Sequence, residues 1–175
     1  MVTVLLLFTH CASDGLTKDE AMRLLRESKS YPAVMDHDVY CGSSEVAKKV
    51  LSTSLVADGY MIAQATHDET TIGRPLVQFT EKAQPFLLTT SDTAKSLDVQ
   101  RVKIADEDLV AIRNIKMEAD NKTAVVEYET ALKNISPFSE LLNRKPEPQQ
   151  IRITFFSRAD NGWVWNKKII KAPAK

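Results

Sequence analysis

Apolar positions follow a helical spacing in the first half of the chain and an alternating spacing in the second half. In residues 18–28, apolar side chains recur every three or four positions, and Thr17-Lys18-Asp19-Glu20 ahead of them forms a capping box. A second run with helical spacing covers 44–57, and Gly59 stands where a glycine commonly follows a helix end. The pattern therefore predicts helices over 18–28 and 44–57.

The region after the second predicted helix has the pattern of strands. Residues 60–88 hold two apolar runs around a polar segment, which predicts a β-hairpin with a long loop and then a short helix limited by Pro85. After the polar linker 89–96, alternation dominates, and Asn161-Gly162 suits the tight turn of a hairpin. The strands predicted in this half are 99–105, 109–118, 123–132, 150–158 and 163–170.

Two of these strands predict which side chains are buried. In 123–132, the alternation of Ala124, Val126, Tyr128 and Thr130 with more polar neighbours predicts one buried face and one wet face. Trp163 and Trp165 share a face of the last strand and are expected to pack with Phe155.

Two segments lack a regular period and are predicted to be connections. Residues 31–42 contain a proline and a glycine, so we expect one short strand there at most. Residues 136–149 contain a Pro-Glu-Pro run and are predicted to be a loop with at most one helical turn.

Composition places the chain among ordinary globular proteins. It has 175 residues, of which 43% are hydrophobic and 26% charged, and it carries 23 basic and 23 acidic side chains. The balance leaves no overall field to attract nucleic acid or an anionic membrane. Residues 14–95 hold nine basic and twelve acidic residues, a net charge of −3, whereas 96–175 hold fourteen and eleven, a net charge of +3. This change of sign favours domains at 14–95 and 96–175, after a signal-like segment at 1–13.

The most informative stretch is the start, MVTVLLLFTHCASDG. Residues 2–8 form an apolar run, Cys11 follows it, and Ala12 to Gly15 supply a short polar tether before the first predicted helix. The run is far below the ~20 residues that a membrane-spanning helix needs. It does reach the lower limit of a signal-peptide core.

The segment Leu6 to Cys11 resembles the lipobox of bacterial lipoproteins, in which the cysteine is acylated and becomes the mature N-terminus. It departs from that box at His10, where a small residue is usual, and at Phe8, where leucine is usual. No Lys or Arg precedes Lys18, so a signal would need a basic region upstream of Met1. The resemblance implies Cys11 as the lipidation site and a cell-envelope location.

Two alternatives to lipidation remain open. Simple cleavage after Ser13 would place Cys11 and Ser13 at the positions where small residues are required. The third interpretation is a buried strand within residues 2–8 of a cytosolic protein. If Cys11 is retained in an oxidising compartment, it could form a disulfide with Cys41, the other cysteine of the chain.

Residues 17–88 resemble a winged helix. The resemblance rests on the order helix, connection, helix and hairpin, and on the phrases 55–62 and 77–83. It implies that helix 44–57 would enter the major groove and that loop 64–75 would be the wing. The charges argue against DNA, because Lys48 and Lys49 stand beside Glu45 and this half of the chain is acidic. We therefore expect a protein-contact role for this half, with nucleic acid an unlikely partner.

The second half ends in Ala159-Asp160-Asn161-Gly162-Trp163, which is similar to a hairpin common near the end of small bacterial envelope proteins of unknown function. The chain as a whole resembles such exported lipoproteins.

One local cluster has metal or nucleophile chemistry: Asp36, His37, Asp38 and Cys41. Carboxylates, an imidazole and a thiol are transition-metal ligands, but no second cluster completes a four-ligand site in this sequence. A Cys41–His37 pair would also need an orienting group and an oxyanion site, and no spacing indicates either. The interpretation without a functional site is a polar loop beside a buried thiol.

Together these patterns predict an α+β protein, with a winged-helix-like subdomain followed by a mostly antiparallel β-sheet subdomain. The expected function is that of an exported, lipid-anchored envelope protein that binds a protein partner, with no catalytic residue, metal or cofactor assigned. The alternative is a cytoplasmic winged-helix DNA-binding protein.

Overall fold

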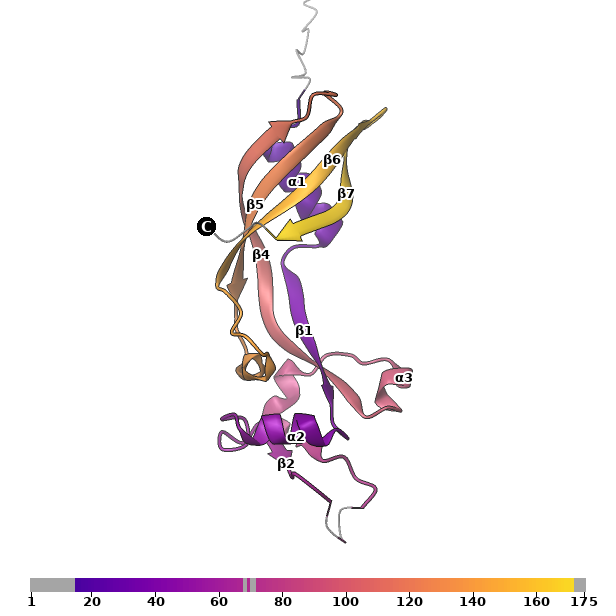
Figure 1. The fold of residues 1–175 in the computed structure, drawn as a ribbon, viewed down its shortest axis with the longest axis vertical. Helices are drawn as coiled ribbons and strands as arrows, with labels where there is room; N and C mark the ends of the chain where they lie inside the picture. Colours follow the sequence, from indigo (N-terminus) through magenta and orange to yellow (C-terminus); the bar gives the residue numbers. More distant parts are fainter. Residues whose placement is uncertain (1–14, 68, 70–71, 172–175) are drawn as a thin grey trace, which may run out of the picture. The chain divides into compact units, whose positions relative to one another are not determined.

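A computed structural model describes residues 15–67, 69 and 72–171 of the chain. Helices and strands both contribute, so the predicted α+β class is confirmed (Figure 1). In chain order the elements are α1 (Lys18–Lys29), β1 (Ala33–Tyr40), α2 (Ser44–Leu51), β2 (Met61–Ala63), β3 (Val77–Phe79), the 3-10 helix η1 (Glu81–Phe86), α3 (Asp92–Lys95), β4 (Val99–Met117), β5 (Thr123–Lys133), the 3-10 helix η2 (Pro137–Leu141), β6 (Gln149–Ala159) and β7 (Gly162–Lys171).

The strands form two sheets. Among the described residues, one sheet has five antiparallel strands in the order β1-β4-β5-β6-β7, and the other is the two-stranded pair β2-β3. β1 runs antiparallel to β4 and is placed at the end of the strand order, so one of its two edges faces away from the sheet.

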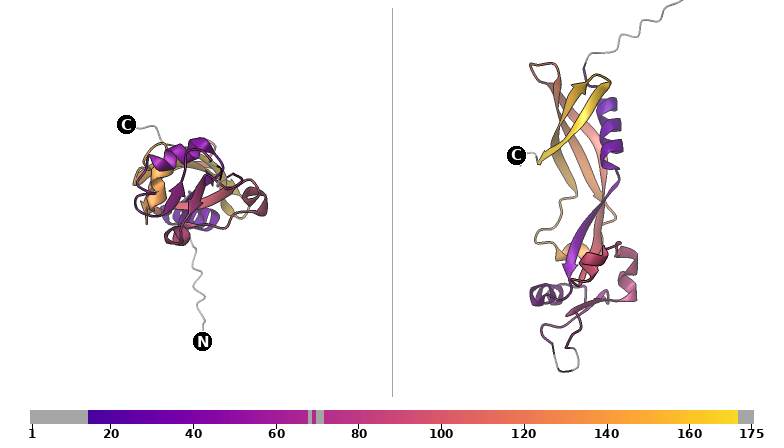
Figure 2. Two further views of the ribbon diagram at one scale, coloured as in Figure 1. Left: turned by 90° about the horizontal axis from the view of Figure 1, so that it is seen from below. Right: turned by 90° about the vertical axis from the view of Figure 1, so that its right-hand side faces the viewer.

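The described chain divides into two compact units. Unit 1 comprises residues 15–30, 110–129 and 151–171, and unit 2 comprises residues 31–109 and 130–150, with 68, 70 and 71 not described. In unit 1, α1 packs against β7 and lies along the strands (Figure 2). Thr17 caps α1 by accepting a hydrogen bond from the Glu20 amide, as the capping box predicts.

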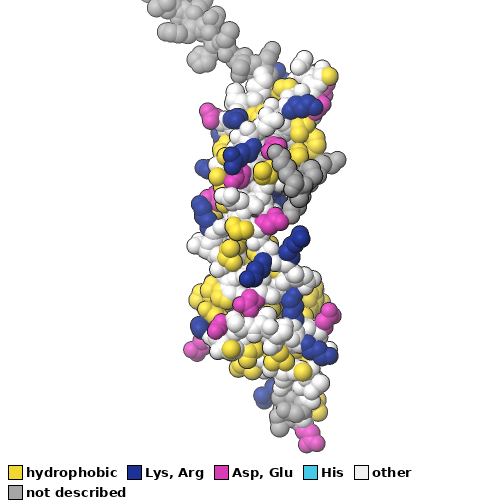
Figure 3. All heavy atoms as spheres, turned by 60° about the vertical axis from the view of Figure 1, so that its left-hand side comes forward, with side chains coloured by type: hydrophobic (Ala, Val, Ile, Leu, Met, Phe, Trp, Pro, Cys, Tyr) yellow, Lys and Arg dark blue, Asp and Glu magenta, His cyan; other side chains and the backbone are white. Residues whose placement is uncertain are grey.

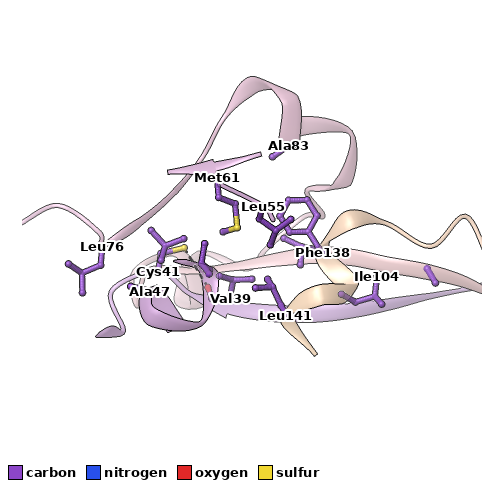
Figure 4. Packing of buried hydrophobic residues seen from close by; sticks show 14 residues of the cluster. Val39, Cys41, Ala47, Leu55, Met61, Leu76, Ala83, Ile104, Phe138 and Leu141 are labelled. Carbon is purple, nitrogen blue, oxygen red and sulfur yellow. Dashed lines mark hydrogen bonds between the residues drawn. The ribbon is translucent and has the colours of Figure 1, made fainter. Parts of the chain in front are cut away.

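The core of unit 2 is built around Phe138 of η2. Its ring centroid lies 5.8 to 6.1 Å from those of Tyr60, Phe79 and Phe86. Figure 4 shows Phe138 beside Leu55 within the buried cluster. An aromatic side chain from the predicted loop 136–149 therefore joins the core on which α2, β2 and η1 pack.

Most of the predicted elements are present, with three differences in extent. The segment 31–42, predicted as a connection, contains the eight-residue strand β1. The predicted strands 99–105 and 109–118 are one continuous strand, β4. The acidic residues 106–108 are tolerated inside it because each has a partner: Asp106 binds Lys103, Glu107 accepts from Thr130, and Asp108 binds Lys133.

The second predicted helix is shorter than expected, since α2 ends at Leu51 instead of residue 57. The hydroxyls of Ser52 and Thr53 donate to the carbonyls of Lys49 and Val50 and so capture the last turn. The amide of Ser54 then donates to the Glu140 carboxylate at 2.8 Å, which holds the following turn outside the helix.

The burial predictions for the strands hold only in part. The face of β5 that was predicted to be wet is not exposed, because Val125 and Glu127 are half-buried and Glu129 is buried and ion-paired with Arg113. Ala124, Val126, Tyr128 and Thr130 are all buried, as expected. In β6 the core aromatic is Phe156 instead of Phe155. Phe156 is paired directly with Trp165 across the hairpin, and directly paired residues share a face.

The winged-helix arrangement is not confirmed. α1 packs against β7 in unit 1, whereas α2, β2 and β3 pack together in unit 2. The predicted domains 14–95 and 96–175 stay a prediction, because contacts within the folded chain do not show which segment folds alone.

Candidate functional site

A cleft of about 420 Å³ opens in unit 2 beside β1. It combines the end of β1, one face of α2 and the segment that follows η2. Its lining residues are His37, Asp38, Tyr40, Ser43, Glu45, Val46, Lys49, Leu141 and Asn143. We call this the β1 cleft.

His37 is a partly buried histidine that lines this cleft. Side chains alternate along β1, and His37 lies on the inner side with Val39, while Asp36, Asp38 and Tyr40 are exposed. Burial lowers the pKa of His37 from its ordinary value of 6.5; Lys49 lowers it further, and Asp38 and Asp36 act in the opposite direction. His37 is therefore a neutral imidazole at pH 7, able to donate one hydrogen bond and accept another.

Three hydrogen bonds hold the walls of the β1 cleft in place. Lys49 Nζ donates to Asn143 Oδ1 at 2.6 Å, which ties α2 to the segment after η2. At the other end of α2, the amide of Ser43 donates to the Tyr40 carbonyl at 3.0 Å, and Ser43 Oγ accepts from the Val46 amide. The turn between β1 and α2 is thus fixed by the capping residue of the helix.

The predicted cluster of Asp36, His37, Asp38 and Cys41 does not converge on one point. The two carboxylates project from the exposed face of β1, and both face Arg101: the bond to Asp36 Oδ2 is 2.6 Å, and Asp38 Oδ1 is 4.0 Å away. His37 and Cys41 belong to the inner side of the strand. Among the described residues, no group of three or more His, Cys, Asp or Glu side chains is arranged to hold a metal ion.

Cys41 lines a different cleft, of about 310 Å³, together with β3 and the start of β4. Its Sγ donates to the Val39 carbonyl at 3.6 Å. Burial, with a smaller contribution from Asp98, raises the pKa of the thiol from 9.0 to about 11. Since the thiolate is the nucleophile, Cys41 is chemically quiet at neutral pH. Because Cys41 and His37 line different clefts, the structure gives no support for a Cys41–His37 nucleophile pair.

Several lining residues of the β1 cleft had no signal in the sequence. Asn143 lies in a segment predicted as a loop, and Leu141 ends the single turn of η2. For Lys49 the sequence indicates only a contact to DNA. Tyr40, which is 54% exposed, is a large aromatic residue at the edge of the cleft. Only the tertiary approach of α2 to residues 141–143 groups them.

The surface carries no single-sign field over the face that Figure 3 presents, where basic and acidic side chains are interspersed. Cys11 lies outside the described residues. Within the described part of the chain, no helix is long and apolar enough to cross a membrane. Comparison with protein-family models, with curated proteins and with solved structures gives no match for this chain.

Proposed function

We propose that the protein is an exported envelope protein, lipid-anchored through Cys11, that serves as a binding module. The observation that carries the anchor is the apolar run 2–8, which Cys11 follows shortly before a polar tether and the first turn of α1. Acyl chains contribute about 0.8 kcal/mol per buried methylene, so two or three chains hold a globular domain at a membrane surface without a spanning helix.

The binding role is supported by the β1 cleft. It is open, it combines apolar side chains such as Val46 and Leu141 with charged ones such as Glu45 and Lys49, and it contains a neutral histidine. Such mixed concave surfaces suit recognition, in which a few polar groups orient an occupant that apolar contacts hold.

The anchor is tested by expressing the protein from its native upstream region and measuring intact mass and membrane fractionation. We expect the wild type in the membrane fraction with an acylated Cys11, and Cys11→Ala in the soluble fraction. Cys41→Ala is the matched control, because it removes the other cysteine and should leave the membrane fraction unchanged. A wild type that is soluble and starts at Met1 would refute the proposal.

The alternative function is that of a cytoplasmic DNA-binding protein. One observation favours it: α2 is followed by the β2-β3 hairpin, with Lys48 exposed on α2. Against it, Lys49 is bonded to Asn143, and α1 packs in the other unit. Binding of a duplex of about 20 base pairs that weakens steeply with salt would support it, since phosphate contacts release counterions.

A further inference from the structure

The outer edge of β1 presents backbone groups that β4 does not use. The Arg101 carbonyl accepts from the Leu88 amide at 2.9 Å, and the Arg101 amide donates to Thr90 Oγ1 at 3.0 Å, so Arg101 bonds on the side away from β1. Asp38 is the direct partner of Arg101 across the strand pair. When a residue in an antiparallel pair bonds on the side away from its partner strand, the residue opposite it also directs its amide and carbonyl away from the pair. The amide and carbonyl of Asp38 therefore point to the outer edge of β1.

The same geometry repeats at alternate positions. Asp36 is opposite Lys103, whose carbonyl accepts from the Ser136 hydroxyl on the side away from β1. At the other end, the Cys41 amide donates to the Asp98 carbonyl at 2.8 Å, so Cys41 bonds toward β4 and the amide of its neighbour Tyr40 is directed outward, while the Tyr40 carbonyl already accepts from the Ser43 amide. Within the described part of the chain, no strand pairs with this outer edge. An open edge of this length is a ready template for a further strand.

The side chains beside this edge have a definite chemistry on each face. Asp36, Asp38 and Tyr40 project from the exposed face, so an added strand would meet two carboxylates and an aromatic ring there. On the inner face, His37 leads into the β1 cleft, where Val46 and Leu141 offer apolar contact. The edge and the cleft are therefore contiguous, and an added strand would need polar and apolar side chains at alternate positions to complement them.

We propose that the outer edge of β1 binds an extended segment of a partner protein as an additional strand, with basic residues alternating with medium-sized apolar ones. The basic side chains lie opposite Asp36 and Asp38, and an apolar side chain between them enters the β1 cleft beside His37. Main-chain hydrogen bonds supply affinity, and the alternate side chains supply specificity, as in other cases of strand addition. This rests on the proposed role as a binding module but not on the anchor at Cys11.

A basic segment fits this edge better than a second copy of the chain. If two β1 strands paired antiparallel about a two-fold axis at His37, Asp36 of each copy would lie opposite Asp38 of the other. Like charges directly opposite each other destabilise a strand pair. Arg101 already bonds Asp36, yet it lies at 4.0 Å from Asp38, which leaves that carboxylate available to a cation on the partner.

The probe is the synthetic peptide (Val-Lys)4, added to the purified full chain in a non-ionic detergent. Its eight residues match the length of β1. We expect binding, measured by fluorescence anisotropy, and slower hydrogen exchange at the amides of Asp36, Asp38 and Tyr40 in the complex. The peptide (Val-Glu)4 is the charge control, and it should bind at least about tenfold more weakly because its side chains repel the two aspartates.

Methylation of the peptide backbone tests the strand geometry without altering the protein. In an antiparallel addition, the lysine residues opposite Asp36 and Asp38 direct their amides toward β1, and the valine amides face solvent. N-methylation of the two central lysine residues should weaken binding by about tenfold or more, whereas N-methylation of the two central valine residues should change it by less than about threefold.

Two protein variants separate charge from backbone at the same position. Asp38→Asn removes the carboxylate and should weaken binding severalfold while reducing its salt dependence. Asp38→Pro also removes the outward amide, which β4 does not need, so an edge strand tolerates it; it should weaken binding further than Asp38→Asn. If Asp38→Pro fails to fold, the methylated peptides still decide the question.

Absence of (Val-Lys)4 binding, equal effects of the two methylation patterns, or exchange protection that spares β1 would each overturn the inference. So would a concentration-dependent dimer that protects the β1 amides without peptide, because the edge would then be a self-association surface. None of these results bears on acylation of Cys11, which intact mass and membrane fractionation measure separately.

Discussion

Phe138 is the residue whose truncation should cost the most stability in unit 2. Its side chain is fully buried, and its ring contacts three others: Tyr60 at 6.1 Å and an angle of 69°, and Phe79 and Phe86 at 5.8 Å each. Phe→Ala at a buried site costs about 3–5 kcal/mol, from lost transfer free energy and the cavity left behind. Edge-to-face and tilted ring pairs contribute about 0.5–1.5 kcal/mol each beyond the buried area.

We therefore expect Phe138→Ala to lower the free energy of unfolding by about 4–5 kcal/mol, near the upper end of that range. With a denaturant slope of about 2 kcal/mol per molar urea, the midpoint should fall by roughly 2 M. Urea titration followed by far-ultraviolet circular dichroism measures the shift. Tryptophan fluorescence adds a second probe, because Trp163 and Trp165 both lie in unit 1.

Ile135→Ala is the matched control for this experiment. Ile135 lies in the same connection between β5 and β6 but is 47% exposed, so its truncation should change stability by less than about 0.5 kcal/mol. Phe138→Leu, which keeps an apolar side chain, should cost about 1–3 kcal/mol. If Phe138→Ala unfolds within about 1 kcal/mol of the wild type, the aromatic cluster is not the centre of the core.

Three other predictions concern titration, reactivity and a buried charge. Because burial lowers the pKa of His37, the unfolded state binds a proton at this residue more readily than the folded state, so the free energy of unfolding should fall as the pH drops below about 6.5. His37→Gln should reduce this pH dependence in urea titrations between pH 5 and 8. An unchanged pH dependence would contradict the burial argument. Burial raises the pKa of the Cys41 thiol from 9.0 to about 11, which leaves roughly a hundredth as much thiolate at pH 8. Iodoacetamide should therefore label Cys41 at least ~100-fold more slowly in the folded protein than in urea, measured from the mass of the peptide that contains Cys41. Similar labelling rates would show that the thiol is accessible. The Glu129 side chain is 5% exposed and ion-paired with Arg113. Arg113→Ala should therefore lower the free energy of unfolding by about 1–3 kcal/mol, and adding Glu129→Gln should recover part of this loss, as measured by thermal or urea unfolding. Full additivity of the two changes would mean that the two side chains are not coupled.

Local signals in the sequence determined the elements whose stabilising groups are close together along the chain. The capping box at Thr17 starts α1, Asn161-Gly162 closes the β6-β7 hairpin, and the alternation in 123–132 gives the buried face of β5. In each case the hydrogen bonds or the spacing that decide the structure lie within a few residues, so a pattern can express them.

Tertiary structure decided where local signals conflicted with distant partners. The acidic residues 106–108 looked like a break between strands, but Lys103, Thr130 and Lys133 satisfy them inside β4. The segment 31–42 has no regular period and predicted one short strand at most, yet pairing with β4 makes an eight-residue strand there. Strand propensity depends on the neighbouring strand more than on the segment itself.

The candidate site shows the same division. The sequence drew attention to His37 and its acidic neighbours, because carboxylates and an imidazole so close together are unusual. Alternation along β1 then placed His37 inside and Asp36 and Asp38 outside, and the approach of α2 to residues 141–143 added Lys49, Leu141 and Asn143 around it. Side-chain identity is local information, whereas a cleft is made by segments about a hundred residues apart, whose approach only the folded core determines.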